Sequence, residues 1–285
     1  MSRLNEALEK ARREGGREEA AAIERPRAVS TVPSVTALRF VEGAVLTPNL
    51  DGCLTEFLRE DEPWAEQFRT LATRLRAMAG SEQVRRIGLM SAMGGEGKTT
   101  LAAALSLILA EEQRDRVLLI EADLRHRAMD SVLGVKPASG LGDWLNKPSP
   151  HLEVRRIGRR GPFFLGAGRA FARPWELISA PHLANLLDVA ASEFRYVIVD
   201  CPAEGPVADA ARIQAHLDGL LLVVRARTSP RDAILSTIER LDEEKMLGVI
   251  FNAEVGSRTR YKHYRYSSYA EPKGDPKRSK WRRSE

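Results

Sequence analysis

The sequence contains no long apolar run: nowhere do its 285 residues approach the roughly 18 consecutive apolar residues expected of a transmembrane helix. The first ten residues are rich in charge and lack the apolar core of a secretory signal peptide. Only two cysteines occur, Cys53 and Cys201, which excludes a framework of several disulfides and favours a reducing compartment. Together these absences predict a cytoplasmic protein.

The signals of two common binding classes are missing as well. The five histidines are scattered, and no Cys/His spacing typical of a zinc site occurs. The net charge of +5 is concentrated in residues 256–285, where ten Lys/Arg against three Asp/Glu leave the rest of the chain at about −2. The basicity is therefore a property of this tail, and no nucleic-acid partner is expected for the folded domain.

A glycine-rich loop is the most specific motif present. Residues 91–100 read Ser-Ala-Met-Gly-Gly-Glu-Gly-Lys-Thr-Thr, between an apolar run and an Ala/Leu-rich segment that predicts a helix. Strand, glycine-rich turn, Lys-Thr and helix form the context of a phosphate-binding loop. The residues expected to bind the nucleotide are Gly94, Gly95, Glu96, Gly97, Lys98, Thr99 and Thr100. We expect Lys98 to reach the β- and γ-phosphates and Thr99 to hold Mg²⁺.

Four further apolar runs predict strands that are buried on both faces of a sheet. They occur at residues 117–120, 196–199, 220–224 and 248–251. Helical patterns lie between them, most clearly at residues 182–193 and 230–245. This alternation predicts an α/β fold with a doubly wound, mainly parallel sheet, helices on both faces, and a ligand site at the carboxyl ends of the strands.

Composition divides the chain into four parts. An amphipathic helix is predicted over residues 1–25, and a linker with prolines, glycines and no sustained period over residues 26–61. The P-loop domain spans residues 62–255 and opens with a helix that ends near Met78. Residues 256–285 form a basic tail that cannot bury a core of its own.

Carboxylates follow two of the predicted strands. Glu121 and Asp123 lie two residues apart at a strand end, which places them on one side of it, where they would hold Mg²⁺ through its waters and accept a proton. Asp200 ends a later strand in the position of a Walker B aspartate, opposite Thr99 across the metal. The alternative for each carboxylate is a solvated strand end or a turn cap. Asn252 ends the last apolar run and is either an adenine-binding amide or an ordinary strand-end residue.

Four of the five tyrosines lie within nine residues of the basic tail. They are Tyr261, Tyr264, Tyr266 and Tyr269. A core role would need apolar neighbours, and this segment has none. The alternatives are a surface for a membrane or an anionic polymer, and a stacking surface for nucleic acid. Beside an ATP site, the cluster is best interpreted as a set of phosphate acceptors.

The combination resembles the bacterial tyrosine kinases (BY-kinases) of capsule and exopolysaccharide export, of the stand-alone cytoplasmic type. The resemblance covers roughly residues 62–270. Its motifs are Glu-Gln-Phe-Arg-Thr-Leu (66–71), the loop at 91–100, Leu-Leu-Ile-Glu-Ala-Asp-Leu-Arg (118–125), Pro-Trp-Glu-Leu-Ile-Ser-Ala-Pro (174–181), Tyr-Val-Ile-Val-Asp-Cys-Pro (196–202) and Gly-Val-Ile-Phe-Asn (248–252), followed by the tyrosine tail. Ala92, in place of the usual first glycine, is typical of the deviant phosphate loop of the wider partition-ATPase superclass.

This resemblance implies a protein-tyrosine autokinase that uses ATP and Mg²⁺ and phosphorylates the tail of a neighbouring subunit. It implies that Lys98, Asp123 and Glu121 are catalytic, with Asp123 as the base, and that Thr99, Glu121, Asp123 and Asp200 surround the metal. It also implies a membrane-embedded chain-length-regulating adaptor that recruits the protein to the inner face of the membrane, and a cognate tyrosine phosphatase. Self-association through a helix carrying Glu66 and Arg69 is expected.

One difference from the partition ATPases, which the BY-kinases share, and two departures from the BY-kinase pattern bear on the alternatives. Met93 replaces the signature lysine of partition and septum-site ATPases, which disfavours a positioning-type ATPase. Glu121 stands where the family usually has Asp, and it is one methylene longer. The family's self-association motif is usually Glu-x-x-Arg-x-x-Arg, and here it reads Glu66, Arg69 and Ala72, without the second arginine. The last two favour a second interpretation, a catalytically weak or inactive nucleotide-binding regulator of polysaccharide export.

Overall fold

The computed structural model describes residues 39–57, 63–79, 84–113, 116–178, 181–203 and 209–253. The chain divides into two units, Met1–Thr36 and Ala37–Glu285, and all described residues belong to the second. None of the described helices is both long and apolar enough to span a bilayer.

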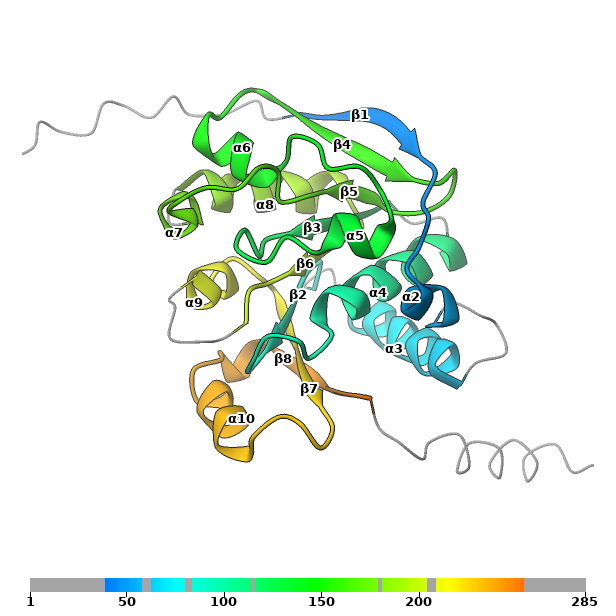
Figure 1. The fold of residues 1–285 in the computed structure, drawn as a ribbon, viewed down its shortest axis with the longest axis vertical. Helices are drawn as coiled ribbons and strands as arrows, with labels where there is room; N and C mark the ends of the chain where they lie inside the picture. The colour runs from blue at the N-terminus through cyan, green and yellow to red at the C-terminus, as the bar shows by residue number, and fades with distance from the viewer. Residues whose placement is uncertain are drawn as a thin grey trace, which may run out of the picture. The chain divides into compact units, whose positions relative to one another are not determined.

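The described strands form one eight-stranded sheet in the order β1-β4-β5-β3-β6-β2-β7-β8 (Figure 1). The strands are β1 (Arg39–Leu46), β2 (Arg86–Ser91), β3 (Val117–Glu121), β4 (His151–Ile157), β5 (Phe163–Leu165), β6 (Tyr196–Asp200), β7 (Gly219–Arg225) and β8 (Met246–Asn252). All neighbouring strands are parallel except β4 and β5. The central strands β3, β6 and β2 are almost entirely buried, as their continuous apolar sequences predict.

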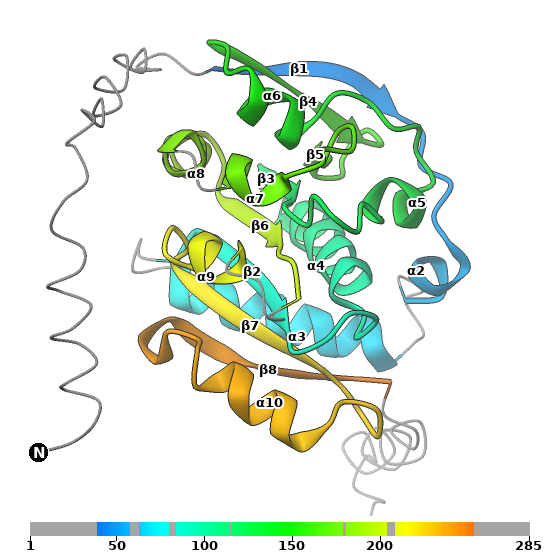
Figure 2. The same ribbon diagram turned by 60° about the vertical axis from the view of Figure 1, so that its left-hand side comes forward.

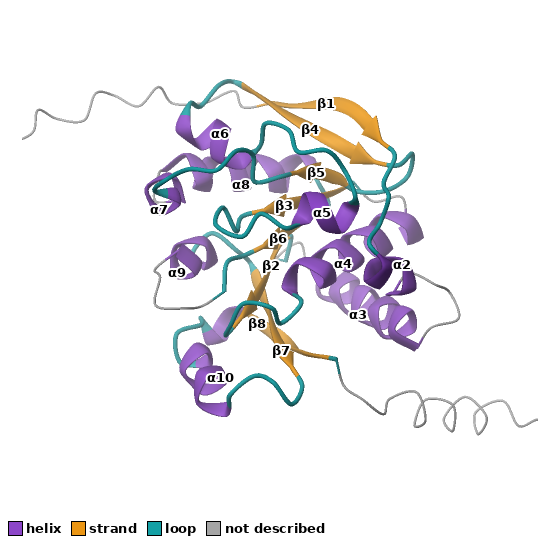
Figure 3. Cartoon of the chain, in the orientation of Figure 1, coloured by secondary structure: helices purple, strands orange, loops and turns teal. Residues whose placement is uncertain are grey.

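Helices cover both faces of the sheet, which confirms the predicted α/β, doubly wound fold (Figures 2 and 3). The helices are α2 (Gly52–Phe57), α3 (Pro63–Ala79), α4 (Lys98–Gln113), α5 (Met129–Leu133), α6 (Leu141–Asn146), α7 (Pro174–Ile178), α8 (Pro181–Glu193), α9 (Asp209–Gln214) and α10 (Arg231–Ile238), with a 3₁₀ turn η1 (Glu243–Lys245). Helix α4 packs on β2, β3 and β6 and is covered in turn by α2 and α3. Helices α8, α9 and α10 lie on the opposite face (Figures 1 and 2).

The second half of the expected linker is instead part of the domain. Residues 39–46 form the edge strand β1, which runs parallel to β4, and residues 52–57 form α2. Leu54 is completely buried, and its backbone N–H donates to Asp51 Oδ1 at 2.6 Å, which caps the helix start. The sequence pattern hides β1 because an edge strand with two exposed valines, Val41 and Val45, carries no continuous apolar run.

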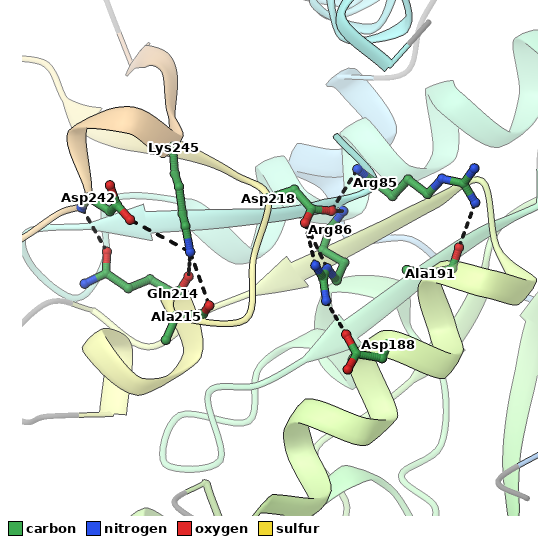
Figure 4. Close-up of polar contacts among 9 residues, drawn as sticks. All are labelled: Arg85, Arg86, Asp188, Ala191, Gln214, Ala215, Asp218, Asp242 and Lys245. Carbon is green, nitrogen blue, oxygen red and sulfur yellow. Dashed lines mark hydrogen bonds and ion pairs between the residues drawn. The ribbon is translucent and has the colours of Figure 1, made fainter. Parts of the chain in front are cut away.

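The helix expected over residues 230–245 ends at Ile238, seven residues early. The chain is diverted by a cluster around Gln214, at the end of α9 (Figure 4). The side chain of Gln214 donates to the Arg240 carbonyl at 3.1 Å and accepts the Asp242 N–H at 3.2 Å, while Lys245 Nζ reaches the Gln214 carbonyl at 3.0 Å. These tertiary bonds, together with an Asp242 side chain that caps η1, replace the helical ones.

At the amino ends of the central strands, an ion pair joins Arg86, the first residue of β2, to Asp218, which precedes β7 (Figure 4). Asp218 Oδ1 accepts two bonds from the Arg86 guanidinium, and its Oδ2 accepts the backbone N–H groups of Arg85 and Arg86 at 3.0 and 2.7 Å. Burial favours the neutral carboxyl, but these hydrogen bonds outweigh it and hold the pKa of Asp218 below its usual range. The carboxylate therefore stabilises the start of β2.

Asp218→Asn is expected to lower the free energy of unfolding at pH 7 by about 2 kcal/mol, since it weakens a partly buried charge-assisted network. A carboxylate with a lowered folded-state pKa stabilises the fold above its unfolded pKa, so wild type should lose this contribution as the pH falls below about 4. The variant should lose less across that range. Asp188→Asn is the matched control, because Asp188 makes an exposed contact with the same Arg86 and should matter little. Urea unfolding between pH 7 and pH 3 measures both, and equal destabilisation by the two variants would contradict this role.

Candidate nucleotide-binding site

The glycine-rich loop lies between the end of β2 at Ser91 and the start of α4 at Lys98. Strand β2 is flanked by β6 and β7, so the carboxyl ends of three strands meet beside the loop. Gly95 and Gly97 have φ angles of +79° and +95°, in the region that favours glycine. Among the described residues, no hydrogen bond engages the backbone N–H groups of Gly95, Gly97 or Lys98. A loop of this shape at a helix N-terminus offers its amides to a phosphate.

Thr99 and Asp200 face each other across this site. The Thr99 hydroxyl donates to Asp200 Oδ2 at 2.7 Å, and Lys98 is nearly buried beside them. Burial raises the pKa of Asp200 to about 7, against the lowering effects of the Lys98 charge and the Thr99 bond. Asp200 Oδ1 is buried and has no hydrogen-bond partner in the described part of the chain.

The donors at this point fit a hard divalent cation. A buried carboxylate oxygen without a partner, next to a threonine hydroxyl, is the kind of oxygen ligand that Mg²⁺ takes. The described residues hold no group of three or more His, Cys, Asp or Glu side chains placed to bind a metal. A Mg²⁺ ion here would therefore take most of its ligands from phosphate oxygens and water, as is usual when Mg²⁺ accompanies a nucleotide.

Asp123 lies in the turn that follows β3 and is also nearly buried. Its Oδ1 accepts the backbone N–H groups of Arg125 and His126 at 3.1 and 3.0 Å, which fixes the carboxylate in the turn. Its Oδ2 lies 3.6 Å from Nδ1 of the exposed His126 ring. One carboxylate oxygen thus holds the turn, and the other remains available for a proton or a water ligand.

Glu121 is oriented differently from the sequence expectation. It is the last residue of β3, completely buried, and both of its carboxylate oxygens accept backbone N–H groups: Met129 at 2.8 Å and Ala167 at 3.1 Å. Burial raises the pKa of Glu121, and these two bonds act in the opposite direction. The side chain therefore joins the end of β3 to the start of α5 and to the segment after β5, and the extra methylene is used to span that distance.

Glu121→Asp tests this placement. The shorter side chain cannot reach both N–H groups, and each buried polar group left unpaired costs about 1–3 kcal/mol, so we expect a loss of about 3 kcal/mol in the free energy of unfolding. Glu111→Asp, at an exposed position of α4, is the matched control. Urea unfolding of the nucleotide-free protein measures the difference. Unchanged stability together with faster phosphate transfer would contradict this placement and would support the original expectation that Glu121 binds the metal.

Glu96 and Asn252 are engaged with the loop itself. Glu96 Oε2 accepts the Met93 N–H at 2.9 Å, and its Oε1 accepts the Ser229 hydroxyl. Asn252 Nδ2 donates to the Glu96 carbonyl at 2.8 Å, and its Oδ1 accepts the Ala253 N–H at 2.8 Å. Ser229 is a loop contact that the sequence analysis missed, because it lies 133 residues away from its partner and belongs to no recognisable motif.

Two other expectations concern surfaces away from this loop. Tyr261, Tyr264, Tyr266 and Tyr269 lie outside the described residues, as do residues 1–25. On α3, Glu66 and Arg69 form an exposed ion pair with each other at 3.5 Å. Ala72 is completely buried in the core, so the position of the missing second arginine faces the domain interior in this chain.

Comparison with known proteins places this loop in a well-defined family. The model of the CobQ/CobB/MinD/ParA nucleotide-binding domain matches residues 87–268. The succinoglycan biosynthesis transport protein ExoP of Rhizobium meliloti (strain 1021) is 32% identical over 197 residues, which is 66% of this chain and 25% of ExoP. The chain thus spans a quarter of the length of that relative.

Two further proteins are similar over most of their own length. Tyrosine-protein kinase YwqD of Bacillus subtilis (strain 168) is 30% identical over 208 residues, covering 72% of this chain and 86% of YwqD. The solved kinase domain of the Escherichia coli tyrosine kinase ETK matches with a TM-score of 0.63 and 26% identity, over 70% of this chain and 82% of that domain.

Proposed function

Because the chain belongs to the CobQ/CobB/MinD/ParA nucleotide-binding family and, within it, to the bacterial tyrosine kinases, we propose that it is an ATP-dependent protein-tyrosine autokinase. The observation that carries this proposal is the Thr99–Asp200 pair beside a phosphate loop, with Asp123 held in the neighbouring turn. A hydroxyl, two carboxylates and a lysine around one loop are the groups that phosphoryl transfer requires.

Each residue has a distinct task in the proposed site. The loop of residues 94–100 binds the polyphosphate through backbone N–H groups, and Lys98 neutralises charge on the β- and γ-phosphates. Thr99 and Asp200 are the protein ligands of Mg²⁺, which when bound offsets the charge of the transferring phosphate. Glu121 is assigned a positioning role, because both of its oxygens are used by backbone N–H groups.

Asp123 is the proposed general base. Tyrosine has a pKa near 10, so at neutral pH its hydroxyl must lose a proton as it attacks the γ-phosphate. Two backbone N–H groups donate to Asp123 Oδ1 and fix the orientation of the carboxylate. Oδ2 accepts neither of these two bonds and is the oxygen proposed to take the proton. In the proposed reaction the tyrosine oxygen forms a bond to phosphorus, its proton passes to Asp123, and ADP leaves with the electrons of the broken bond.

The proposed acceptors are Tyr261, Tyr264, Tyr266 and Tyr269 on a neighbouring subunit. The segment that carries them follows β8 directly, and β8 ends beside the phosphate loop at Asn252. Each phosphate adds a charge of about −1.5 to −2, so four would bring the +7 charge of residues 256–285 close to zero. This loss of positive charge is proposed to release one subunit from another.

The cellular setting is proposed by analogy with the relatives. We place the protein in the cytoplasm at the inner face of the membrane, bound to a chain-length-regulating adaptor and opposed by a tyrosine phosphatase. Its phosphorylation would regulate polymerisation and export of an exopolysaccharide or capsule. Self-association through Glu66 and Arg69 of α3 is proposed, with Ala72 excluded from the contact by its burial.

A second candidate function is a nucleotide-binding regulator of polysaccharide export that transfers phosphate poorly or not at all. Two observations favour it: Glu121 is engaged in the fold, and the interface helix has lost one arginine to a buried alanine. Incubation with γ-labelled ATP, followed by mapping of phosphotyrosine, separates the possibilities. The kinase labels its own tail, the regulator binds ATP without labelling, and a positioning-type ATPase releases free phosphate.

A further inference from the structure

The phosphate loop contains a carboxylate that is shielded from solvent and forms no ion pair with the described part of the chain. Glu96 is only 3% exposed, although it lies among glycines that are themselves exposed or half-buried. Its two oxygens accept the Met93 N–H within the loop and the Ser229 hydroxyl from the segment between β7 and α10. A negative charge in a phosphate-binding loop would repel the phosphate unless hydrogen-bond donors of the protein engage the carboxylate and direct it away from the ligand. The Ser229 hydroxyl and the Met93 N–H are the donors that engage Glu96.

The backbone of the same loop is held from the ends of the two neighbouring strands. Asn252, the last residue of β8, donates from Nδ2 to the Glu96 carbonyl at 2.8 Å. Arg225, the last residue of β7, donates from Nη1 to the Gly95 carbonyl at 2.9 Å. The loop therefore receives three contacts from outside itself, to one carboxylate and two consecutive carbonyl groups.

These contacts belong to one connected unit. Arg225 and Asn252 are register partners in the sheet, and the Ala226 N–H donates to the Asn252 carbonyl at 2.9 Å. The Arg225 N–H in turn donates to the Ser229 hydroxyl oxygen at 2.9 Å, so Ser229 has both a donor and an acceptor. Because the unit is built on paired strands, it holds the loop against a rigid part of the sheet.

The fit between Asn252 and the loop is close. A Cβ atom on Gly97 would lie 2.2 Å from Asn252 Nδ2, so a side chain at this position would displace the Asn252 amide from the loop. The amide oxygen of Asn252 is meanwhile used by the N–H of Ala253. Both ends of the amide are therefore engaged by backbone groups, Nδ2 through one of its two hydrogens and Oδ1 through one of its two lone pairs.

We propose that Ser229 and Asn252 are positioning residues for the phosphate loop, and that they act through Glu96 without contacting the nucleotide. A loop already held in its binding shape loses less conformational freedom when phosphate binds, so its affinity is higher. In this proposal Asn252 positions the phosphate loop and does not recognise the adenine base. The inference concerns binding alone and goes beyond the proposed kinase activity, so it holds whether or not the chain transfers phosphate.

The test compares ligands that share the phosphates and differ in the base. Dissociation constants are measured by calorimetry on the full chain, with Mg²⁺, for ATP, GTP and inorganic tripolyphosphate. Ser229→Ala and Asn252→Ala should each raise all three constants by a similar factor of about ten, since each removes a hydrogen bond to the loop. The double variant should show less than the product of the two factors, because both residues act on Glu96.

Controls separate positioning from general damage. Ser229→Thr keeps the hydroxyl and should bind within about twofold of wild type, whereas Ser192→Ala, at an exposed position of α8, should not change binding. Hydrogen exchange on nucleotide-free protein gives a second readout, since the Met93 N–H should exchange faster in Ser229→Ala. Unchanged binding in Ser229→Ala would overturn the proposal. So would an Asn252→Ala variant that loses affinity for ATP alone, because that result assigns Asn252 to the base.

Discussion

Lys98→Met is expected to reduce phosphate transfer by about 10³-fold and to weaken ATP binding, because it removes the one cation of the loop at the site of developing charge. Lys98 is nearly buried and lies close enough to Asp200 to lower the pKa of that carboxyl. Methionine has similar length and no charge, so it leaves the packing at the start of α4 largely intact while leaving the carboxylates unopposed.

The matched control is Lys136→Met, a change of the same kind at an exposed position after α5. Fluorescent nucleotide binding and a phosphotyrosine immunoblot should separate the two variants completely. A Lys98→Met protein that labels itself at the wild-type rate would show that the loop of residues 94–100 does not serve phosphate transfer. Unfolding curves recorded in parallel distinguish a catalytic loss from a folding defect.

Replacement of all four tail tyrosines, Tyr261, Tyr264, Tyr266 and Tyr269, by phenylalanine is expected to remove at least nine-tenths of the phosphotyrosine formed with ATP. The reason is chemical: phenylalanine keeps the ring and lacks the accepting hydroxyl. The catalytic residues are unchanged in this variant, so its ATP affinity should equal that of wild type.

The remaining tyrosine provides the control for this variant. Tyr196 begins β6 and is 1% exposed, so its hydroxyl is not accessible to another active site while the domain is folded. Tyr196→Phe should therefore leave labelling unchanged. Phosphate found chiefly on Tyr196, or undiminished labelling of the four-phenylalanine chain, would remove the tail from the proposed mechanism.

The sequence predicted the central part of the fold well, for a physical reason. Strands β2, β3, β6 and β7 are buried on both faces, so their apolar runs are continuous and visible. Strands β1, β4 and β5 lie towards one edge of the sheet, and β1 and β4 carry mixed polar sequences. Such short mixed segments acquire their structure from tertiary contacts that no local pattern reports.

The candidate site divides in the same way. The positions of the loop, Thr99 and Asp200 could be predicted from motif spacing, because the carboxyl ends of neighbouring parallel strands lie at the same end of the sheet. Glu121 and Asp123 were expected on one side by strand alternation, but β3 ends at Glu121, and the alternation rule does not extend into the turn that holds Asp123. The contact between Glu96 and Ser229 joins residues far apart in the chain, and only the folded structure reveals it.

The central claim is transfer of phosphate from ATP to the tail of another copy of the chain, and mixing two variants tests it most directly. The four-phenylalanine chain can transfer phosphate but not accept it on the tail, whereas the Lys98→Met chain can accept but not transfer. Incubated separately with ATP they should stay nearly unlabelled, and incubated together they should yield phosphotyrosine on residues 261–269 of the Lys98→Met chain, as read by mass spectrometry. An unlabelled Lys98→Met chain in the mixture, under conditions in which wild type labels itself, would contradict transfer between subunits.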